Sequence, residues 1–280
     1  MELSIMKKQK NKRKGTRVVD VCFKLYTVLV YLFLFSPIVI VIYMSFNKGQ
    51  TNRFPVQEYS LQWYKVLFQN NGIWASLRIS LVIAVLATLS VLIIGTFAAY
   101  AIVRYKFKFK SAFISLMLAP MLIPSVITGI SMLLYFSFIG IKTSVFTVIL
   151  GHSVLTLPYA TMIITARLQG LHISLEEAAR NLGANEWNVF FKIVFPQIKP
   201  GLLSAALFAF TISLDEFALT FFVNSPSSQT LPIRIYSMLK FGLTPELNAL
   251  STIILVLSFG LIGIRMISQS KTERVTKGTD

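Results

Sequence analysis

Six long apolar stretches constrain the fold of this chain more than any other feature of its sequence. A run of about 20 apolar residues matches the thickness of a bilayer core, where every backbone polar group must be satisfied internally, so such runs fold as helices. The six stretches are residues 22–46, 77–103, 112–139, 144–167, 202–223 and 249–267. The composition agrees, because 55% of the residues are hydrophobic and only 14% are charged. We therefore expect an all-α polytopic membrane protein with six transmembrane helices.

A basic tail precedes the first apolar stretch. Residues 1–21 contain seven Lys and Arg side chains between Lys7 and Arg17, and we expect them to form a disordered cytoplasmic tail. Residues 268–280 form a second basic tail. Residues 22–46 are too long for the apolar core of a signal peptide and contain no small-residue cleavage site. We interpret them as a retained transmembrane helix.

The positive charge is distributed according to topology. A net charge of +16 would suggest nucleic-acid binding in a soluble protein. Here the basic residues lie beside apolar stretches, which indicates membrane orientation and contact with anionic lipid, not nucleic acid. Most of them fall in the two tails, in the loop 104–110 and in the segment 168–200. The positive-inside rule therefore places these parts, and both termini, in the cytoplasm.

The sequence contains no recognisable catalytic motif. It lacks a phosphate-binding glycine–lysine loop and the usual motifs of serine hydrolases and zinc enzymes. A single cysteine, Cys22, and two histidines, His152 and His172, offer no metal cluster. We expect no catalytic residue, metal or cofactor, and we interpret His152 chiefly as a hydrogen-bonded packing residue within its span. The energy for any transport must then come from a partner.

Prolines interrupt two of the expected spans. Pro120 and Pro124 lie in the third span and Pro158 lies in the fourth. Each proline removes a backbone donor and bends a helix, which a membrane tolerates where neighbours or a cavity satisfy the freed groups. Two interpretations stay open: these positions form a gate in a transport pathway, or they are static kinks.

The segment 168–200 is the one sizeable polar interruption on the expected cytoplasmic side. Ser174 is a plausible helix N-cap, with Glu177 three residues later as in a capping box. Gly183 fits the left-handed position that ends a helix. A second short helix is expected to start at residues 185–187 and to end before Pro196 and Pro200. A compact helical hairpin in a membrane-protein loop is a candidate docking surface.

The spacing within this segment resembles a known family. Glu177-Ala178-Ala179 is followed by Gly183 after three residues and by Ile193 after nine more, with Pro196 close behind. This pattern resembles the EAA loop of the permeases of ATP-binding-cassette (ABC) importers, with Phe195 in place of the usual leucine. The resemblance implies the type I permease fold for residues 73–267: five transmembrane helices and the loop 168–200. It also implies that this loop is a coupling helix seated in a groove of a cytoplasmic ATPase dimer, which binds the ATP.

An acidic pair interrupts the fifth span. Asp215 and Glu216 lie among apolar residues, where each carboxylate costs a few kcal/mol, on the order of 3, unless it faces a water-filled path or a partner. On a continuous helix the two point about 100° apart, and Thr211 shares the face of Asp215. With Phe217 and its neighbours, the pair suits an extended polyammonium ligand, through ion pairs and cation–π contacts. The alternative is a structural pair that caps a helix or bridges to Arg234.

Further strings extend the resemblance to spermidine/putrescine importer permeases. They are residues 213–217, 231–238 and 245–250. The resemblance implies a second, related permease as a heterodimer partner, an extracellular substrate-binding protein, a polyamine substrate and a place in the bacterial cell membrane. Alternatives are an ABC permease for another solute, such as ferric iron or a phosphonate, or an ion-coupled secondary transporter. The last predicts an inverted repeat, which the sequence does not display.

Overall fold

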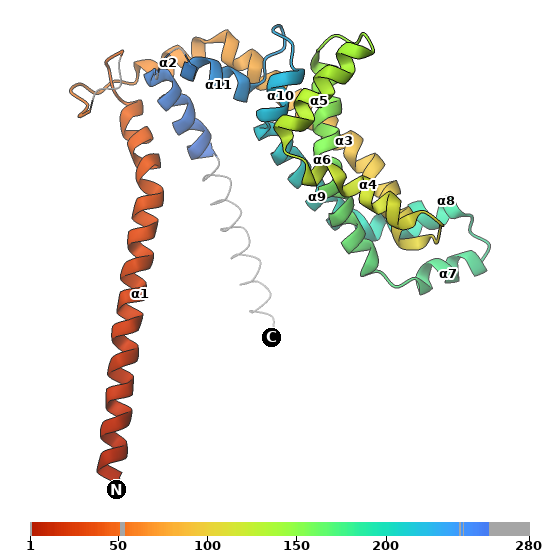
Figure 1. Ribbon diagram of the computed structural model, residues 1–280, viewed down its shortest axis with the longest axis horizontal. Coiled ribbons are helices and arrows are strands. Elements are labelled where there is room, and N and C mark those ends of the chain that lie inside the picture. The colour runs from red at the N-terminus through yellow and green to blue at the C-terminus, as the bar shows by residue number, and fades with distance from the viewer. Residues whose placement is uncertain (1, 51–53, 241, 243, 258–280) are drawn as a thin grey trace, which may run out of the picture. The chain divides into compact units, whose positions relative to one another are not determined.

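The computed structural model describes residues 2–50, 54–240, 242 and 244–257, with side chains from Asp20 onward. The described residues form helices and contain no strand (Figure 1). The chain divides into two compact units, one of which is Asn71–Ser237 and the other the residues on either side of it. The helices of the first part of the chain are α1 (Glu2–Ser45), α2 (Gln62–Gln69), α3 (Asn71–Arg104), α4 (Lys110–Leu122), α5 (Ser125–Phe138) and α6 (Val145–Gln169). They are followed by α7 (Ser174–Asn181), α8 (Glu186–Asn188), a π-helical turn η1 (Val189–Val194), α9 (Phe195–Asp215), α10 (Ala218–Val223) and α11 (Leu231–Lys240).

The expected class of all-α polytopic membrane protein is confirmed. Four helical segments among the described residues are long and apolar enough to cross a membrane: Asp20–Ser45, Asn71–Arg104, Val145–Gln169 and Glu186–Asp215. The pair α4 and α5 makes a fifth if it counts as one span. Of the expected sixth span, 249–267, the structure describes an apolar helix at Pro245–Leu257. The remainder of that span and the tail 268–280 lie outside the described residues.

The N-terminal tail differs from the expectation. Helix α1 begins at Glu2, so the residues expected to be disordered continue the first spanning helix. Lys and Arg are good helix formers, and a helix already fixed by its apolar part extends at little cost because only the first turn is expensive to nucleate.

The third span is broken rather than bent. Helices α4 and α5 meet at an angle of 106°, whereas we expected one kinked helix over 112–139. The break falls at Pro124, and Pro120 lies within α4 without ending it. Ile123 is extended (φ −98°, ψ 127°), because a residue that precedes proline is sterically disfavoured in the helical region. Of the two prolines, Pro124 therefore makes the turn.

The fourth span agrees with its predicted limits. Helix α6 starts after Ser144, which forms a capping box with Thr147. It continues unbroken through Pro158, which is buried against its neighbours. The kink expected at Pro158 therefore does not interrupt the helix.

The fifth span begins earlier and ends earlier than expected. Pro196 and Pro200 do not end the preceding helix: α8 continues through η1 into α9, which contains both prolines. A π-helical turn shifts the hydrogen-bond register by one residue, so Pro196 falls in the first turn of α9, where a missing donor costs little. The helix then stops at Asp215 and resumes at Ala218, so 202–223 is two helices.

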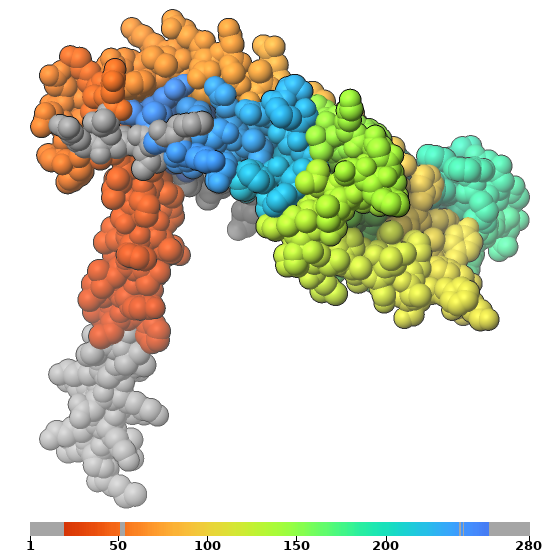
Figure 2. Space-filling model, turned by 45° about the horizontal axis from the view of Figure 1, so that its top comes forward, coloured from red at the N-terminus to blue at the C-terminus, as the bar shows by residue number. Residues whose placement is uncertain are grey.

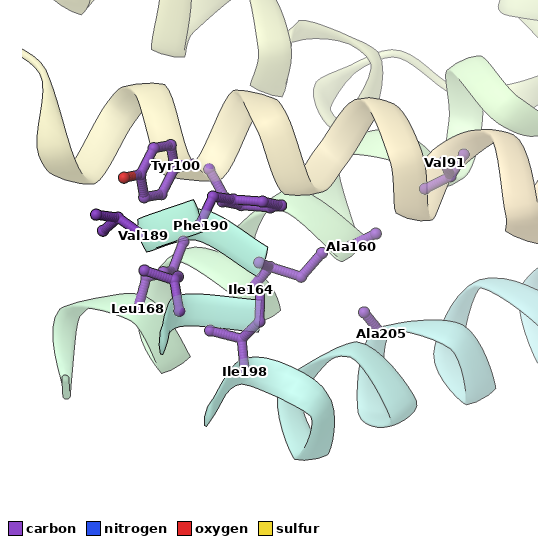
Figure 3. Close-up of a cluster of buried hydrophobic side chains, with 11 residues drawn as sticks. Val91, Tyr100, Ala160, Ile164, Leu168, Val189, Phe190, Ile198 and Ala205 are labelled. Carbon is purple, nitrogen blue, oxygen red and sulfur yellow. The ribbon is translucent and has the colours of Figure 1, made fainter. Parts of the chain in front are cut away.

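A core of buried side chains joins the spans to the segment 168–200, which we call the coupling segment after its expected role. Figure 3 shows Phe190 of η1 between Tyr100 of α3 and Ile164 and Leu168 of α6. The ring centroid of Phe190 lies 5.2 Å from that of Tyr100. Ile198 and Ala205 of α9 belong to the same cluster. Because this cluster contains residues from α3, α6, η1 and α9, the loop 168–200 is packed against the membrane helices.

Candidate functional site

Helix α7 carries the start of the EAA-like motif and ends as its sequence predicts. Gly183 has φ +87°, the left-handed conformation that glycine adopts without strain. Its N–H donates to the carbonyl of Arg180, and the N–H of Ala184 donates to that of Ala179, at 2.9 and 3.0 Å. These two bonds form a Schellman motif, which satisfies the last carbonyls of the helix. The chain direction after α7 therefore depends on a glycine at this position.

The start of α7 differs from the expectation. Ile173, not Ser174, is the N-cap residue, and no side chain caps this end. Glu177 is exposed, and its predecessor Glu176 is buried. Because Ser174 is already helical, the predicted capping box with Glu177 does not form, and both side chains are left free of that role.

Glu176 forms a buried ion pair with Arg104 that the sequence did not reveal. Its Oε1 lies 2.7 Å from Nη2 and 2.8 Å from Nε of Arg104, and the two side chains are 3% and 9% exposed. Nη2 of Arg104 also reaches the carbonyls of Leu168 and Leu171 at 3.4 Å. Arg104 thus joins the end of α3, the end of α6 and helix α7. The loop 104–110 and the coupling segment consequently share one end of the helix bundle.

The coupling segment, part of which is drawn in teal in Figure 2, exposes large apolar side chains. Leu182 is 89% exposed and Trp187 is 64% exposed. The ring of Trp187 stacks on that of Phe191, with centroids 5.8 Å apart. Beside them, Arg180 donates to Glu186 (Nε to Oε1, 2.8 Å), which lowers the pKa of the Glu186 carboxyl. An exposed apolar patch of this kind marks an interaction surface.

The residues of the EAA-like motif spread over this segment. Those exposed are Glu177, Ala178, Gly183 and Pro196, whereas Ala179 and Ile193 are half-buried. Ile193 lies in η1, next to the buried Val194. The motif residues thus lie on both the exposed and the packed side of the segment.

The acidic pair lies at the break between α9 and α10. Asp215 is the last residue of α9 and is exposed, and within the described residues no hydrogen bond or ion pair engages its carboxylate. Glu216 is extended (ψ 112°), and its Oε1 accepts from the N–H of Leu219 at 2.8 Å. Thus the pair does not share one continuous helix as we expected: Glu216 caps α10, and Asp215 is free. No ion pair joins either to Arg234 in the part of the chain that is described.

Aromatic rings lie next to this break in the helix, which we call the acidic corner and which contains Asp215 and Glu216. The ring of Phe217 is 4.9 Å from that of Tyr236 and 5.8 Å from that of Phe221. Tyr236 comes from α11, a helix that lies between the fifth and the sixth expected span. Thr211, four residues before Asp215, is exposed and bonds to the carbonyl of Leu207. The structure thus adds Tyr236 to the predicted aromatic surroundings of the pair.

Comparison with known proteins identifies the family. Residues 91–270 match the family described as "Binding-protein-dependent transport system inner membrane component". The chain belongs to this family. The permease is 34% identical to the spermidine/putrescine transport system permease protein PotC of Escherichia coli (strain K12), over 87% of this chain and 92% of that protein. It is 37% identical to PotC of Haemophilus influenzae over 84% and 91% of the two chains.

A third relative and two solved structures are also similar to this permease. The putrescine transport system permease protein PotI of E. coli K12 is 35% identical, over 84% of each chain. A bacterial ABC transporter involved in the import of the polysaccharide alginate gives a TM-score of 0.69 at 17% identity, covering 91% of the permease and 96% of that chain. The methionine transporter MetNI gives 0.56 at 19%, over 75% and 98%. These likenesses confirm the ABC importer permease fold.

Proposed function

We propose that this permease imports polyamines, and that Asp215 meets the cationic substrate in the membrane. The observation that carries the proposal is the exposed carboxylate of Asp215 at a break in a spanning helix, without a partner among the described residues. A carboxylate in an apolar span is costly unless it serves a ligand or a water-filled path. The relatives named spermidine/putrescine and putrescine permeases support a polyammonium substrate.

The depth of the corner suits a cation that arrives from outside. Asp215 lies twenty residues after Phe195 along α9, which at 1.5 Å per residue is about 30 Å, close to the thickness of a bilayer core. Since Phe195 lies within the coupling segment 168–200, at the start of α9, Asp215 lies toward the opposite side of the membrane. An extracellular binding protein would release its ligand on that side.

The aromatic rings give the corner a second means of holding an ammonium group. Tyr236 and Phe221 are 42% and 49% exposed, so part of each side chain is accessible to a ligand. A cation over an aromatic face gains about 0.5–2 kcal/mol. A polyamine carries several ammonium groups along a flexible apolar chain, so one can pair with Asp215 while another lies over a ring.

The coupling segment would pass the energy of ATP hydrolysis to this corner. In our proposal the exposed surface around Glu177, Gly183 and Leu182 docks on a cytoplasmic ATPase dimer. Both termini are then cytoplasmic, a second related permease completes the pathway, and an extracellular binding protein delivers the substrate. The permease itself hydrolyses nothing. The gating role of Pro124, at the 106° turn between α4 and α5, is part of the same proposal.

The test is uptake of labelled spermidine and putrescine in cells that lack their own importer. Asp215→Asn keeps the shape and removes the charge, and should lower uptake at least about tenfold, because a lost charge-assisted contact of about 1.4 kcal/mol corresponds to tenfold. Asp215→Glu should restore much of the loss. Glu216→Gln should do less, since the glutamine oxygen can still accept from Leu219 N–H and cap α10.

The matched control is Asp20→Asn, the same chemical change at an exposed carboxylate where the first span begins. It should leave uptake and membrane abundance unchanged. Normal uptake by Asp215→Asn would refute the proposed substrate contact. So would a loss of uptake that is fully accounted for by a lower amount of assembled complex.

A further inference from the structure

His152 is the buried polar residue of the membrane helices whose contacts reach both sides of the acidic corner. It lies on α6, is 1% exposed, and uses both ring nitrogens. Nδ1 is 2.7 Å from the hydroxyl of Ser213 at the end of α9, and Nε2 is 2.7 Å from the hydroxyl of Thr220 on α10. One imidazole therefore connects the helix before the break to the helix after it.

The hydrogen-bond pattern fixes the tautomer of this ring. The Thr220 hydroxyl donates its single hydrogen to the carbonyl of Glu216, at 2.8 Å. Its oxygen must therefore accept from His152, so Nε2 carries the proton. In the neutral ring Nδ1 then accepts from the Ser213 hydroxyl. The resulting chain runs from Ser213 through His152 and Thr220 to the backbone of Glu216, and it satisfies a carbonyl that the break leaves without a helical partner.

The packing around the corner leaves α10 little freedom. A Cβ atom at Gly151, beside His152, would lie 2.5 Å from Cδ2 of Leu219, and a Cβ at Gly129 of α5 would lie 3.0 Å from its Cα. The Thr147 hydroxyl, at the start of α6, shares its hydrogen between the carbonyls of Val223 and Ser144, at 2.9 and 2.8 Å. Helix α10 is thus held by close contacts at Leu219, and by hydrogen bonds to α6 near both of its ends.

We propose that His152 is a positioning residue that sets the orientation of the Asp215–Glu216 corner. It does so by bridging the two halves of the broken fifth span, and it need not touch the substrate. Asp215 lies two residues after Ser213, and Glu216 lies four before Thr220. Both acidic residues therefore lie in the short stretch of chain between the two residues that His152 bridges. The functional consequence of this role rests on the proposed contact between Asp215 and a polyamine. The bridging of α9 and α10 by His152 does not depend on that contact.

The first experiment measures the corner itself. Asp215→Cys in a Cys22→Ser background introduces a reporter thiol, which is reacted with a small reagent that carries an ammonium group. His152→Leu keeps an apolar side chain of similar size and removes both hydrogen bonds, and should change the labelling rate at least about fivefold. His152→Gln, whose amide can both accept and donate, should stay within about twofold of the parent. Ser153→Ala is the control, because the hydrogen bond of that hydroxyl in the described structure is to the carbonyl of Ile149 within the same helix.

The second experiment measures uptake in a double-mutant cycle. If His152 acts through Asp215, adding His152→Leu to Asp215→Asn should cause no loss beyond that of Asp215→Asn alone, whereas His152→Leu by itself should lower uptake about fivefold or more. His152→Gln should recover uptake. Membrane abundance of each complex is measured alongside, so that misfolding is not read as lost positioning.

The two experiments separate the two proposals. An unchanged labelling rate in His152→Leu, with normal membrane abundance, overturns the positioning role. A changed rate together with normal uptake in Asp215→Asn leaves His152 as the bridge but refutes the substrate contact. Losses by His152→Leu and Asp215→Asn that multiply in the double variant would show that His152 acts on transport by another route, and would overturn the functional part of this inference.

Discussion

The buried ion pair between Arg104 and Glu176 makes a strong prediction about how the coupling segment is held. The two side chains are 9% and 3% exposed, so removal of Glu176 leaves the Arg104 guanidinium buried without its carboxylate partner. Such a loss costs about 3–5 kcal/mol. For a unit the size of Asn71–Ser237, each kcal/mol lowers the melting temperature by about 2–4 °C. Glu176→Ala should therefore lower it by roughly 6–20 °C.

The neighbouring glutamate provides a matched control. Glu177 lies in the same turn of α7 but is exposed, so Glu177→Ala should change the melting temperature little. Its effect should appear instead in ATP hydrolysis stimulated by the binding protein, because the exposed side of α7 is the proposed docking surface. The assay is thermal unfolding of the purified complex in detergent, followed by intrinsic fluorescence, with ATP hydrolysis measured on the same samples.

A double variant tests the pairing directly. Arg104→Met with Glu176→Leu replaces the two charges by apolar groups, which is often neutral in a buried site. It should therefore be more stable than Glu176→Ala alone. If Glu176→Ala is as mild as Glu177→Ala, or if the double variant loses the sum of its single changes, the ion pair does not hold the segment and the reasoning is refuted.

Three further predictions concern topology, coupling and pH. Cysteines at Lys108 and Ser227, in a cysteine-free background, should react with an impermeant thiol reagent from opposite sides of the membrane; labelling from the same side would contradict the proposed orientation. Gly183→Asp should insert normally but lose transport-linked ATP hydrolysis and ATPase binding, because φ +87° strains a side-chain-bearing residue by about 1 kcal/mol or more; wild-type transport would exclude the coupling role. Arg180 lowers the pKa of Glu186 in the folded protein. The contact between them therefore stabilises the fold at a pH above the pKa that Glu186 has in the unfolded chain. This stabilisation is lost as the pH falls through the lower pKa of the folded state. Stability profiles of the parent and of Glu186→Gln should therefore converge in acid, and profiles that stay parallel would contradict this contribution.

The class of the protein and the position of the EAA-like motif follow from the sequence alone. Apolar stretches of spanning length leave only helices, because a bilayer core satisfies no backbone polar group. Gly183 was predictable as well, because the left-handed end of a helix is a local property of one residue and its neighbours. For the same reason the spacing of the EAA-like motif, which lies within one loop, could be read directly.

Which polar groups meet depends on the packing of the helices. Glu176 and Glu177 are adjacent and chemically identical, yet one is buried because Arg104, 72 residues away, lies beside it. His152 meets Ser213 across 61 residues and Thr220 across 68. We expected the acidic pair on one helix, but α9 ends at Asp215, and Leu219 of α10 packs closely against Gly129 of α5 and Gly151 of α6. Such pairings depend on how distant helices pack, and helical periodicity and local capping contain no information on that.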